Sequence, residues 1–298
     1  MCGIIGYSGP KEPLPILING LSRLEYRGYD SAGIAISDGN KITVEKKEGK
    51  LDVLKNHLKD SNIKGNIGIG HTRWATHGVP NDVNAHPHSD NSEEFAIIHN
   101  GIIENYAEIK KDLLEEGFEF KSDTDTEVVA VELSRKWNGQ LLRTVTDVAK
   151  TLEGTYAFVV TTTKEEGTIV AGRLMSPLVL GVGENEVFLA SDSAAILEHT
   201  NKMIFLENGD FVEIKNGQYK LFDADLNEIE REIQEIDWEV SEAEKLGYDH
   251  FMYKEILEQS EVIERTISGR IETTSKEIPI KQDEALEYEK IWIVACGT

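Results

Sequence analysis

The order of its strand-like and helix-like segments most constrains what this chain can fold into. Strands and two early helices come first, three amphipathic helices follow, and strands then crowd together again. The expected strands cover residues 4–7, 31–37, 41–46, 66–71, 94–99, 156–162, 168–172, 178–182, 187–190, 211–214 and 219–221, and the expected helices cover residues 13–23, 51–58, 105–116, 126–137 and 141–152. This order favours an α+β domain with layered antiparallel sheets over a βαβ repeat.

Three short turn sequences support the antiparallel arrangement. Asp38-Gly39-Asn40, Asn208-Gly209 and Asn216-Gly217 each lie between two apolar segments. Such dipeptides are typical of tight hairpin turns, because Asn and Gly tolerate positive φ angles. We therefore predict a hairpin at each of the three positions.

The amino-acid composition of the chain changes after residue 222. Residues 223–247 are rich in Asp and Glu, and we interpret them as a solvated linker leaving the first domain. A new helix is expected over residues 248–267, followed by an apolar run at 290–298 that ends in Gly-Thr. That run is typical of the first buried strand of a parallel sheet. We expect the chain to stop at the start of a second domain.

Composition excludes several classes of function. The 298 residues carry a formal net charge of −23, which repels phosphate backbones and anionic membranes. Only two cysteines are present, so a disulfide framework is excluded and a reducing cytoplasm is expected. No apolar run is long enough to cross a bilayer, and the N-terminus lacks the pattern of a signal peptide.

Cys2 is the first candidate catalytic residue. It follows Met1, which we expect to be removed because Cys is small. Removal would leave a thiol and a free α-amine on one residue, which is a nucleophile and its base together. The alternative is a small buried residue that opens a strand.

A second polar cluster covers residues 71–78, which read His-Thr-Arg-Trp-Ala-Thr-His-Gly. The guanidinium of Arg73 beside Thr hydroxyls suits the capture of a small-molecule carboxylate, and Trp74 could form an apolar wall or lid. The alternative is a surface loop with an Arg side chain extended into water.

Two more clusters follow the next expected strand. Asn100 and Gly101 come directly after it and could direct an amide and a backbone N–H at a developing oxyanion. Residues 122–127 contain Asp125, which could pair with a substrate ammonium, although these residues could simply cap the next helix. A thiol, a carboxylate binder, an ammonium binder and oxyanion donors together match an amino acid with a reactive side-chain acyl group, and glutamine fits.

Histidines invite a metal interpretation, which we do not adopt. His71, His77, His86, His88 and His99 lie near these clusters, and His86 and His88 alternate as strand ligands would. No C-x-x-C or H-E-x-x-H pattern accompanies them, so neither a metal nor another cofactor is predicted. His86 is interpreted instead as a polar wall of the pocket.

These motifs resemble, in order, those of the glutamine–fructose-6-phosphate aminotransferase family. The matching runs are residues 2–6, 24–33, 71–78, 99–101 and 122–127, and the likeness extends over essentially the whole chain. The resemblance implies a four-layer αββα sandwich of the N-terminal nucleophile hydrolase, class II glutamine amidotransferase type. It implies a glutamine amidotransferase domain at 1–222 and the truncated start of a sugar isomerase domain at 248–298.

The resemblance also implies roles for individual residues. Cys2 would attack the glutamine amide, Asn100 and Gly101 would form the oxyanion hole, and Asp125 would bind the α-ammonium. Arg73 would bind the substrate carboxylate, and the substrate-binding residues Trp74, Thr76, His77 and His86 would line the same pocket.

The resemblance finally implies how this chain relates to a longer enzyme. This chain would only hydrolyse glutamine, whereas the full-length protein would also use fructose 6-phosphate and would dimerise mainly through the missing isomerase domain. A glutamine sensor with an inactive site, an autoprocessed amidohydrolase and another class II amidotransferase are the alternatives.

Overall fold

The computed structural model describes residues 2–27, 29–75, 78–236, 248 and 251–267. The chain divides into two compact units, Met1–Glu244 and Lys245–Thr298. The first unit holds all but one of the elements below. The second holds the helix α6 (Phe251–Ile267), which agrees with the helix expected there.

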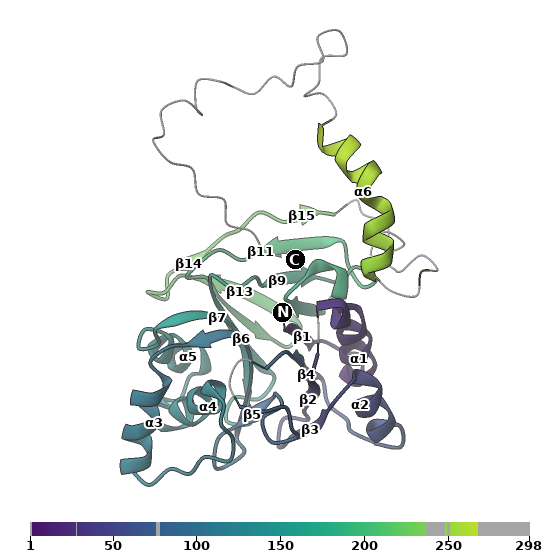
Figure 1. Ribbon diagram of the computed structural model, residues 1–298. Coiled ribbons are helices and arrows are strands. Elements are labelled where there is room, and N and C mark those ends of the chain that lie inside the picture. The colour runs from purple at the N-terminus through teal and green to yellow at the C-terminus, as the bar shows by residue number, and fades with distance from the viewer. Residues whose placement is uncertain (1, 28, 76–77, 237–247, 249–250, 268–298) are drawn as a thin grey trace, which may run out of the picture. The chain divides into compact units, whose positions relative to one another are not determined.

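The first sheet of the described residues contains eight strands (Figure 1). Its spatial order is β15-β11-β9-β10-β1-β4-β2-β3, and all of its pairings are antiparallel. The strands are β1 (Gly3–Ser8), β2 (Ser31–Ser37), β3 (Ile42–Glu48), β4 (Ile67–Arg73), β9 (Val179–Val182), β10 (Val187–Ala190), β11 (Lys202–Phe205) and β15 (Gln234–Glu235). The N-terminal strand β1 is therefore central, with β10 on one side and β4 on the other.

The second sheet contains seven strands of the described chain, in the order β14-β13-β12-β8-β7-β6-β5. Its strands are β5 (His88–Ser89), β6 (Phe95–Ile103), β7 (Gly154–Thr162), β8 (Thr168–Leu174), β12 (Phe211–Lys215), β13 (Gln218–Phe222) and β14 (Glu228–Ile229). Every pairing in this sheet is also antiparallel. The predicted α+β class with antiparallel sheets is confirmed.

The helices of the first unit lie on the outer faces of its two sheets (Figure 1). The helices of the first unit are α1 (Pro13–Leu24), α2 (Leu51–Leu58), α3 (Tyr106–Glu115), α4 (Asp125–Arg135) and α5 (Leu141–Ala149), with short 3₁₀ turns at Glu25–Arg27 and Ser193–Ala195. Leu17 and Leu21 of α1 and Leu54 of α2 pack on the first sheet. Val129 of α4 and Val145 of α5 pack on the second.

Besides the two apolar layers between helices and sheets, a third apolar layer lies between the two sheets. Ile4 and Ile69 of the first sheet share one buried cluster with Ile98 and Val159 of the second. Alternate residues of β1 face opposite sides, since Ile5 belongs to the cluster that α1 covers. The layers are thus helices, sheet, sheet and helices, which confirms the predicted four-layer αββα sandwich.

Two expectations about strands were wrong. The strand expected to end at His99 continues through Ile103, because residues 100–103 keep pairing with β7. The hairpin predicted at Asn208-Gly209 does not form, since β11 belongs to the first sheet and β12 to the second. The Asn208 side chain instead accepts a hydrogen bond from Met175 N (2.7 Å), which ties this crossover to the end of β8.

The other two predicted hairpins are present. Residues 38–40 join β2 to β3. Asn216 and Gly217 join β12 to β13 with φ angles of 52° and 74°, the positive pair that such a turn requires.

The polar segment after residue 222 still contributes to the sandwich. Its short strand β14 pairs with β13, and β15 pairs with β11, so residues up to Glu235 extend the edges of both sheets. The linker interpretation of 223–247 and the domain boundary at 222 stay predictions. The strand expected at 290–298 lies outside the described residues.

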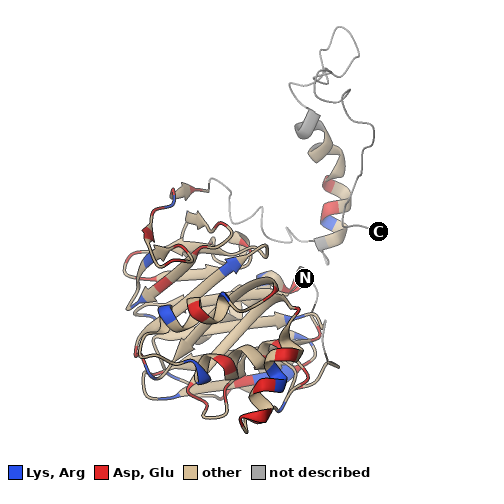
Figure 2. Ribbon diagram, turned by 90° about the vertical axis from the view of Figure 1, so that its left-hand side faces the viewer, with Lys and Arg blue, Asp and Glu red and all other residues tan. Residues whose placement is uncertain are grey.

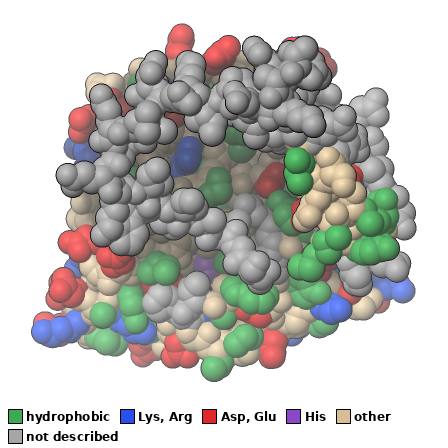
Figure 3. All heavy atoms as spheres, turned by 45° about the horizontal axis from the view of Figure 1, so that its top comes forward, with side chains coloured by type: hydrophobic (Ala, Val, Ile, Leu, Met, Phe, Trp, Pro, Cys, Tyr) green, Lys and Arg blue, Asp and Glu red, His purple; other side chains and the backbone are tan. Residues whose placement is uncertain are grey.

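The surface reflects the acidic composition. Asp and Glu residues are distributed over helices, strands and loops of the first unit (Figure 2). Hydrophobic side chains of the described residues appear among charged ones on the face drawn in Figure 3. None of the described helices has both the length and the hydropathy needed to span a membrane.

Candidate active site

Cys2 lies directly before β1, at the end of the central strand of the first sheet. Its Sγ accepts a hydrogen bond from Trp74 N at 3.2 Å. The residue is partly exposed. Burial of the thiol raises the pKa of Cys2 above its ordinary value, with the Trp74 backbone acting in the opposite direction. The group is therefore a thiol at neutral pH, and a base must take its proton before it can attack.

Arg73 is the last residue of β4, the neighbour of β1. Its side chain is buried with 4% of its surface exposed, so the alternative of an Arg extended into water is wrong. Nη2 donates to the Gly78 carbonyl at 3.3 Å, and Nη1 lies 4.0 Å from Asp30 Oδ1. Asp30 also accepts a hydrogen bond from Ala75 N. Asp30 thus fixes the chain beyond Trp74 while it balances the guanidinium charge.

Asn100 and Gly101 lie within β6 of the second sheet. The Asn100 amide reaches across to the first sheet, where its Nδ2 donates to the Cys2 carbonyl at 3.1 Å. Gly101 has φ +138°, and a Cβ built there would lie 2.0 Å from the Thr155 carbonyl oxygen. Only glycine fits this position, because both the dihedral and the space exclude a side chain.

Asp125 occupies the first turn of α4 and is 4% exposed. The capping expected for this segment is present, since Thr124 Oγ1 accepts a hydrogen bond from Glu127 N at 3.3 Å. Glu127 in turn accepts from Ser122 N at 2.6 Å. Asp125 itself accepts from Ile103 N at 2.9 Å, which joins α4 to the end of β6. Residues 122–127 can therefore cap α4 and also contribute Asp125 to the site.

Four buried histidines lie among these groups: His71, His86, His88 and His99. The His71 ring stacks on His86 with centroids 4.3 Å apart, and His88 meets His86 edge-on at 4.7 Å. Burial lowers the pKa of His71 to about 3, and burial also lowers the pKa of His86 and His88 well below the usual value. His99 shares a hydrogen bond of 3.0 Å with Thr126 Oγ1.

These histidines serve as hydrogen-bonding groups. Within the described part of the chain, no three His, Cys, Asp or Glu side chains are arranged to hold a metal ion. His77, the fifth histidine of the metal interpretation, lies outside the described residues.

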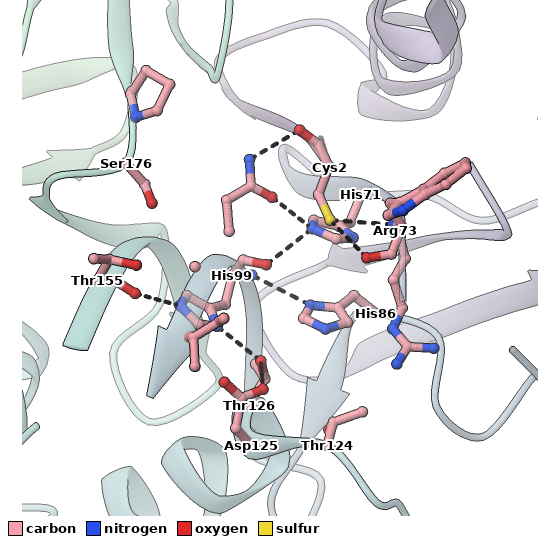
Figure 4. Close-up of a pocket in the computed structure, with 15 residues that line it drawn as sticks. Cys2, His71, Arg73, His86, His99, Thr124, Asp125, Thr126, Thr155 and Ser176 are labelled. Carbon is pink, nitrogen blue, oxygen red and sulfur yellow. Dashed lines mark hydrogen bonds between the residues drawn. The ribbon is translucent and has the colours of Figure 1, made fainter. Parts of the chain in front are cut away.

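One cavity of about 380 Å³ brings the predicted groups together (Figure 4). Its walls include seven of the nine predicted site residues: Cys2, Arg73, Trp74, His86, Asn100, Gly101 and Asp125. The other two, Thr76 and His77, lie outside the described residues. Trp74 lies in this wall with 55% of its surface exposed.

The cavity also has walls that were not predicted as site residues: His71, His99, Ile102, Thr124, Thr126, Thr155, Ser176 and Pro177. His71, His99, Thr124 and Thr126 belong to the sequence motifs named above, but the motifs alone assign them no place in the pocket. Thr155 lies at the start of β7, and Ser176 and Pro177 lie between β8 and β9, where no polar cluster in the sequence marks them.

Comparison with known proteins places these observations in a family. A family model described as a glutamine amidotransferase domain matches residues 56–240. The glutamine–fructose-6-phosphate aminotransferase [isomerizing] of Fusobacterium nucleatum is 50% identical over 305 residues, which cover 100% of this chain and 50% of the relative. The enzyme of the same name from Clostridium perfringens is 49% identical over 302 residues, with the same coverage.

A solved structure supports the fold. The glutamine phosphoribosylpyrophosphate amidotransferase from B. subtilis, complexed with ADP and GMP, aligns with a TM-score of 0.67 and 28% identity over 76% of this chain and 50% of that chain. The chain spans about half the length of the curated relatives it matches.

Proposed function

The chain belongs to the glutamine amidotransferase domain family, and we propose that it hydrolyses glutamine to glutamate and ammonia with Cys2 as its nucleophile. One observation carries the proposal: the Cys2 thiol, the Arg73 guanidinium and the Asp125 carboxylate line the same cavity. The two charged groups match the carboxylate and ammonium of an α-amino acid, and the thiol is available for its side-chain amide.

Binding would fix the substrate by both of its charges. Arg73 is buried, so its charge pair with the substrate carboxylate would be little screened by water. Asp125, in the first turn of α4, would hold the α-ammonium. Trp74 and His86 would cover the aliphatic part of the substrate, and Thr76 and His77 are proposed to complete this side on the evidence of sequence alone.

The chemical step begins with proton transfer. Because burial raises the pKa of the Cys2 thiol, the thiolate has to be generated at the moment of attack. After Met1 is removed, the α-amine of Cys2 would take the thiol proton, directly or through a water molecule. Its ordinary pKa of about 7.7–8.0 leaves part of it neutral at pH 7.

Attack forms a bond from Sγ to the amide carbon and places negative charge on the amide oxygen. The Asn100 amide and the Gly101 backbone N–H are the proposed donors to this oxyanion. Collapse breaks the carbon–nitrogen bond, and the protonated α-amine gives its proton to the departing ammonia. Water then hydrolyses the thioester and releases glutamate, so no metal or organic cofactor takes part.

The longer protein is proposed to use the ammonia. The curated relatives are named glutamine–fructose-6-phosphate aminotransferases, and residues 248–298 would begin their sugar isomerase domain. We propose that the full-length form converts fructose 6-phosphate to glucosamine 6-phosphate, dimerises through that domain and works in the cytoplasm. The low cysteine content supports a reducing compartment.

Labelling with a glutamine-like electrophile tests the proposal. We expect one adduct on Cys2, protection by glutamine, and release of glutamate and ammonia in equal amounts from unlabelled protein. A glutamine sensor would bind glutamine and release neither product, which would contradict the proposal. Formation of glucosamine 6-phosphate by the full-length form tests the second part separately.

A further inference from the structure

We propose that His71 is a positioning residue that holds the Asn100 amide with its NH₂ group toward Cys2. This inference rests on the glutaminase function proposed above, in which that amide faces the developing oxyanion. His71 lies on β4 of the first sheet, and Asn100 lies on β6 of the second. The imidazole therefore joins the two sheets beside the nucleophile (Figure 4).

The hydrogen bonds of His71 fix which nitrogen carries its proton. Nε2 lies 2.9 Å from Asn100 Oδ1 and 3.0 Å from the His99 carbonyl oxygen. The backbone carbonyl can only accept, so Nε2 must donate. The ring is fully buried, and its pKa of about 3 keeps it neutral at physiological pH, which leaves Nδ1 without a proton. Nδ1 has no hydrogen-bond partner among the described residues.

This single proton specifies the orientation of the amide. In the observed orientation, Asn100 Oδ1 accepts from His71 while Nδ2 donates to the Cys2 carbonyl at 3.1 Å. In the opposite orientation, the NH₂ group would meet the N–H of His71, and the amide oxygen would meet the Cys2 carbonyl. Both contacts would then be repulsive, so His71 and the Cys2 carbonyl together select one orientation.

The selected orientation has a catalytic consequence. An amide NH₂ has two protons, and the bond to the Cys2 carbonyl uses one of them. The second proton remains for the substrate oxygen. Preorganised donors are effective because they need no reorientation when the charge develops. His71 therefore acts through Asn100, without contact to the reacting atoms.

The stacking contact supports a fixed imidazole. His86 lies parallel to His71 with an interplanar angle of 17°, and His86 Nδ1 accepts a hydrogen bond from His99 N at 3.3 Å. The neighbouring ring is thus held by the same strand, β6, that carries Asn100.

The test compares His71→Phe, which keeps a ring but has no donor, with His71→Gln, whose amide can still donate to both oxygens. We expect His71→Phe to lower kcat for glutamine hydrolysis on the order of 100-fold, the usual effect of losing one oxyanion donor, with KM changed by less than about threefold. His71→Gln should recover most of the rate. An equal loss in both variants would overturn the proposal, because the donor would then be irrelevant.

A double-mutant cycle separates positioning from general damage. If His71 acts through Asn100, adding His71→Phe to Asn100→Ala should lower kcat no further. Multiplicative losses would overturn the proposal. Glutamate γ-semialdehyde forms a thiol adduct whose tetrahedral carbon bears an oxygen. It should bind His71→Phe on the order of 100-fold more weakly, while glutamate binds equally well.

A measurement on the unaltered chain needs neither activity nor a variant that folds. Nitrogen NMR of the histidine side chains should find the His71 ring neutral with its proton on Nε2 at pH 7. A proton on Nδ1, or a cationic ring, would contradict the proposal. Absence of glutaminase activity in the parent chain would instead contradict the proposed function, and the NMR measurement would still show which nitrogen of His71 carries the proton.

Discussion

Acid is expected to destabilise the first unit through its buried histidines. Burial lowers the pKa of His71 to about 3 and also lowers the pKa of His86 and His88 well below the usual value. In the unfolded chain each returns to about 6.5, so the unfolded state binds more protons as the pH falls below that value. The free energy of unfolding therefore has its full value above pH 6.5 and falls progressively as the pH drops from 6.5 toward the pKa values of the folded state.

The magnitude follows from the linkage relation. At pH 5.5 each histidine that is neutral only in the folded state lowers the free energy of unfolding by about 1.4 kcal/mol. Three such residues give about 4 kcal/mol, a large share of the roughly 5–15 kcal/mol typical of a domain. Little change is expected between pH 8 and pH 7.5, where all three are neutral in both states.

Urea unfolding followed by tryptophan fluorescence at pH 8, 7, 6 and 5.5 measures this loss. His88→Gln provides an internal comparison, because removal of one titrating group should reduce the loss between pH 8 and 5.5 by about 1.4 kcal/mol. A total loss below about 1 kcal/mol would refute the reasoning, since the imidazoles would then be charged or hydrated in the folded state.

Three substitutions test individual wall residues. Gly101→Ala should lower the free energy of unfolding by roughly 2 kcal/mol or more and abolish glutamate release, because its Cβ would lie 2.0 Å from the Thr155 carbonyl oxygen. Gly117→Ala is the matched control for urea unfolding, since Gly117 also has a positive φ (+93°) but nothing within 4 Å of its Cβ position. An equal loss of stability in both variants would contradict the clash. Arg73→Lys should raise the KM for glutamine about tenfold or more, since a single ammonium cannot make a bidentate pair with a carboxylate. Asp125→Asn should also raise KM while it keeps the hydrogen bond from Ile103 N, and an unchanged KM would remove Asp125 from substrate binding.

The sequence could predict the layers and most of the site, because both depend on local patterns. Arg73 ends an apolar strand, Asp125 begins a helix and Cys2 follows Met1, so each stands at a position that the sequence itself marks. The order of the elements predicted the α+β class with antiparallel sheets, whereas the four-layer sandwich was implied by the family resemblance.

The failures have a common physical origin in tertiary pairing. Asn208-Gly209 does form a turn, but turn chemistry cannot say whether the flanking strands pair with each other, and β11 pairs with β9 instead. The end of β6 was missed because residues 100–103 gain their partners from β7, far along the chain. The contact from His71 to Asn100 likewise joins two sheets, and no local pattern encodes it.

The role of Cys2 is tested by glutamate release from glutamine by this chain, beside Cys2→Ala and a version that retains Met1. We expect activity in the parent and none in either variant, because one lacks the thiol and the other lacks the free α-amine next to it. Full activity with Met1 retained would mean that the α-amine is not the base. Activity in Cys2→Ala would contradict the central claim that this thiol is the nucleophile.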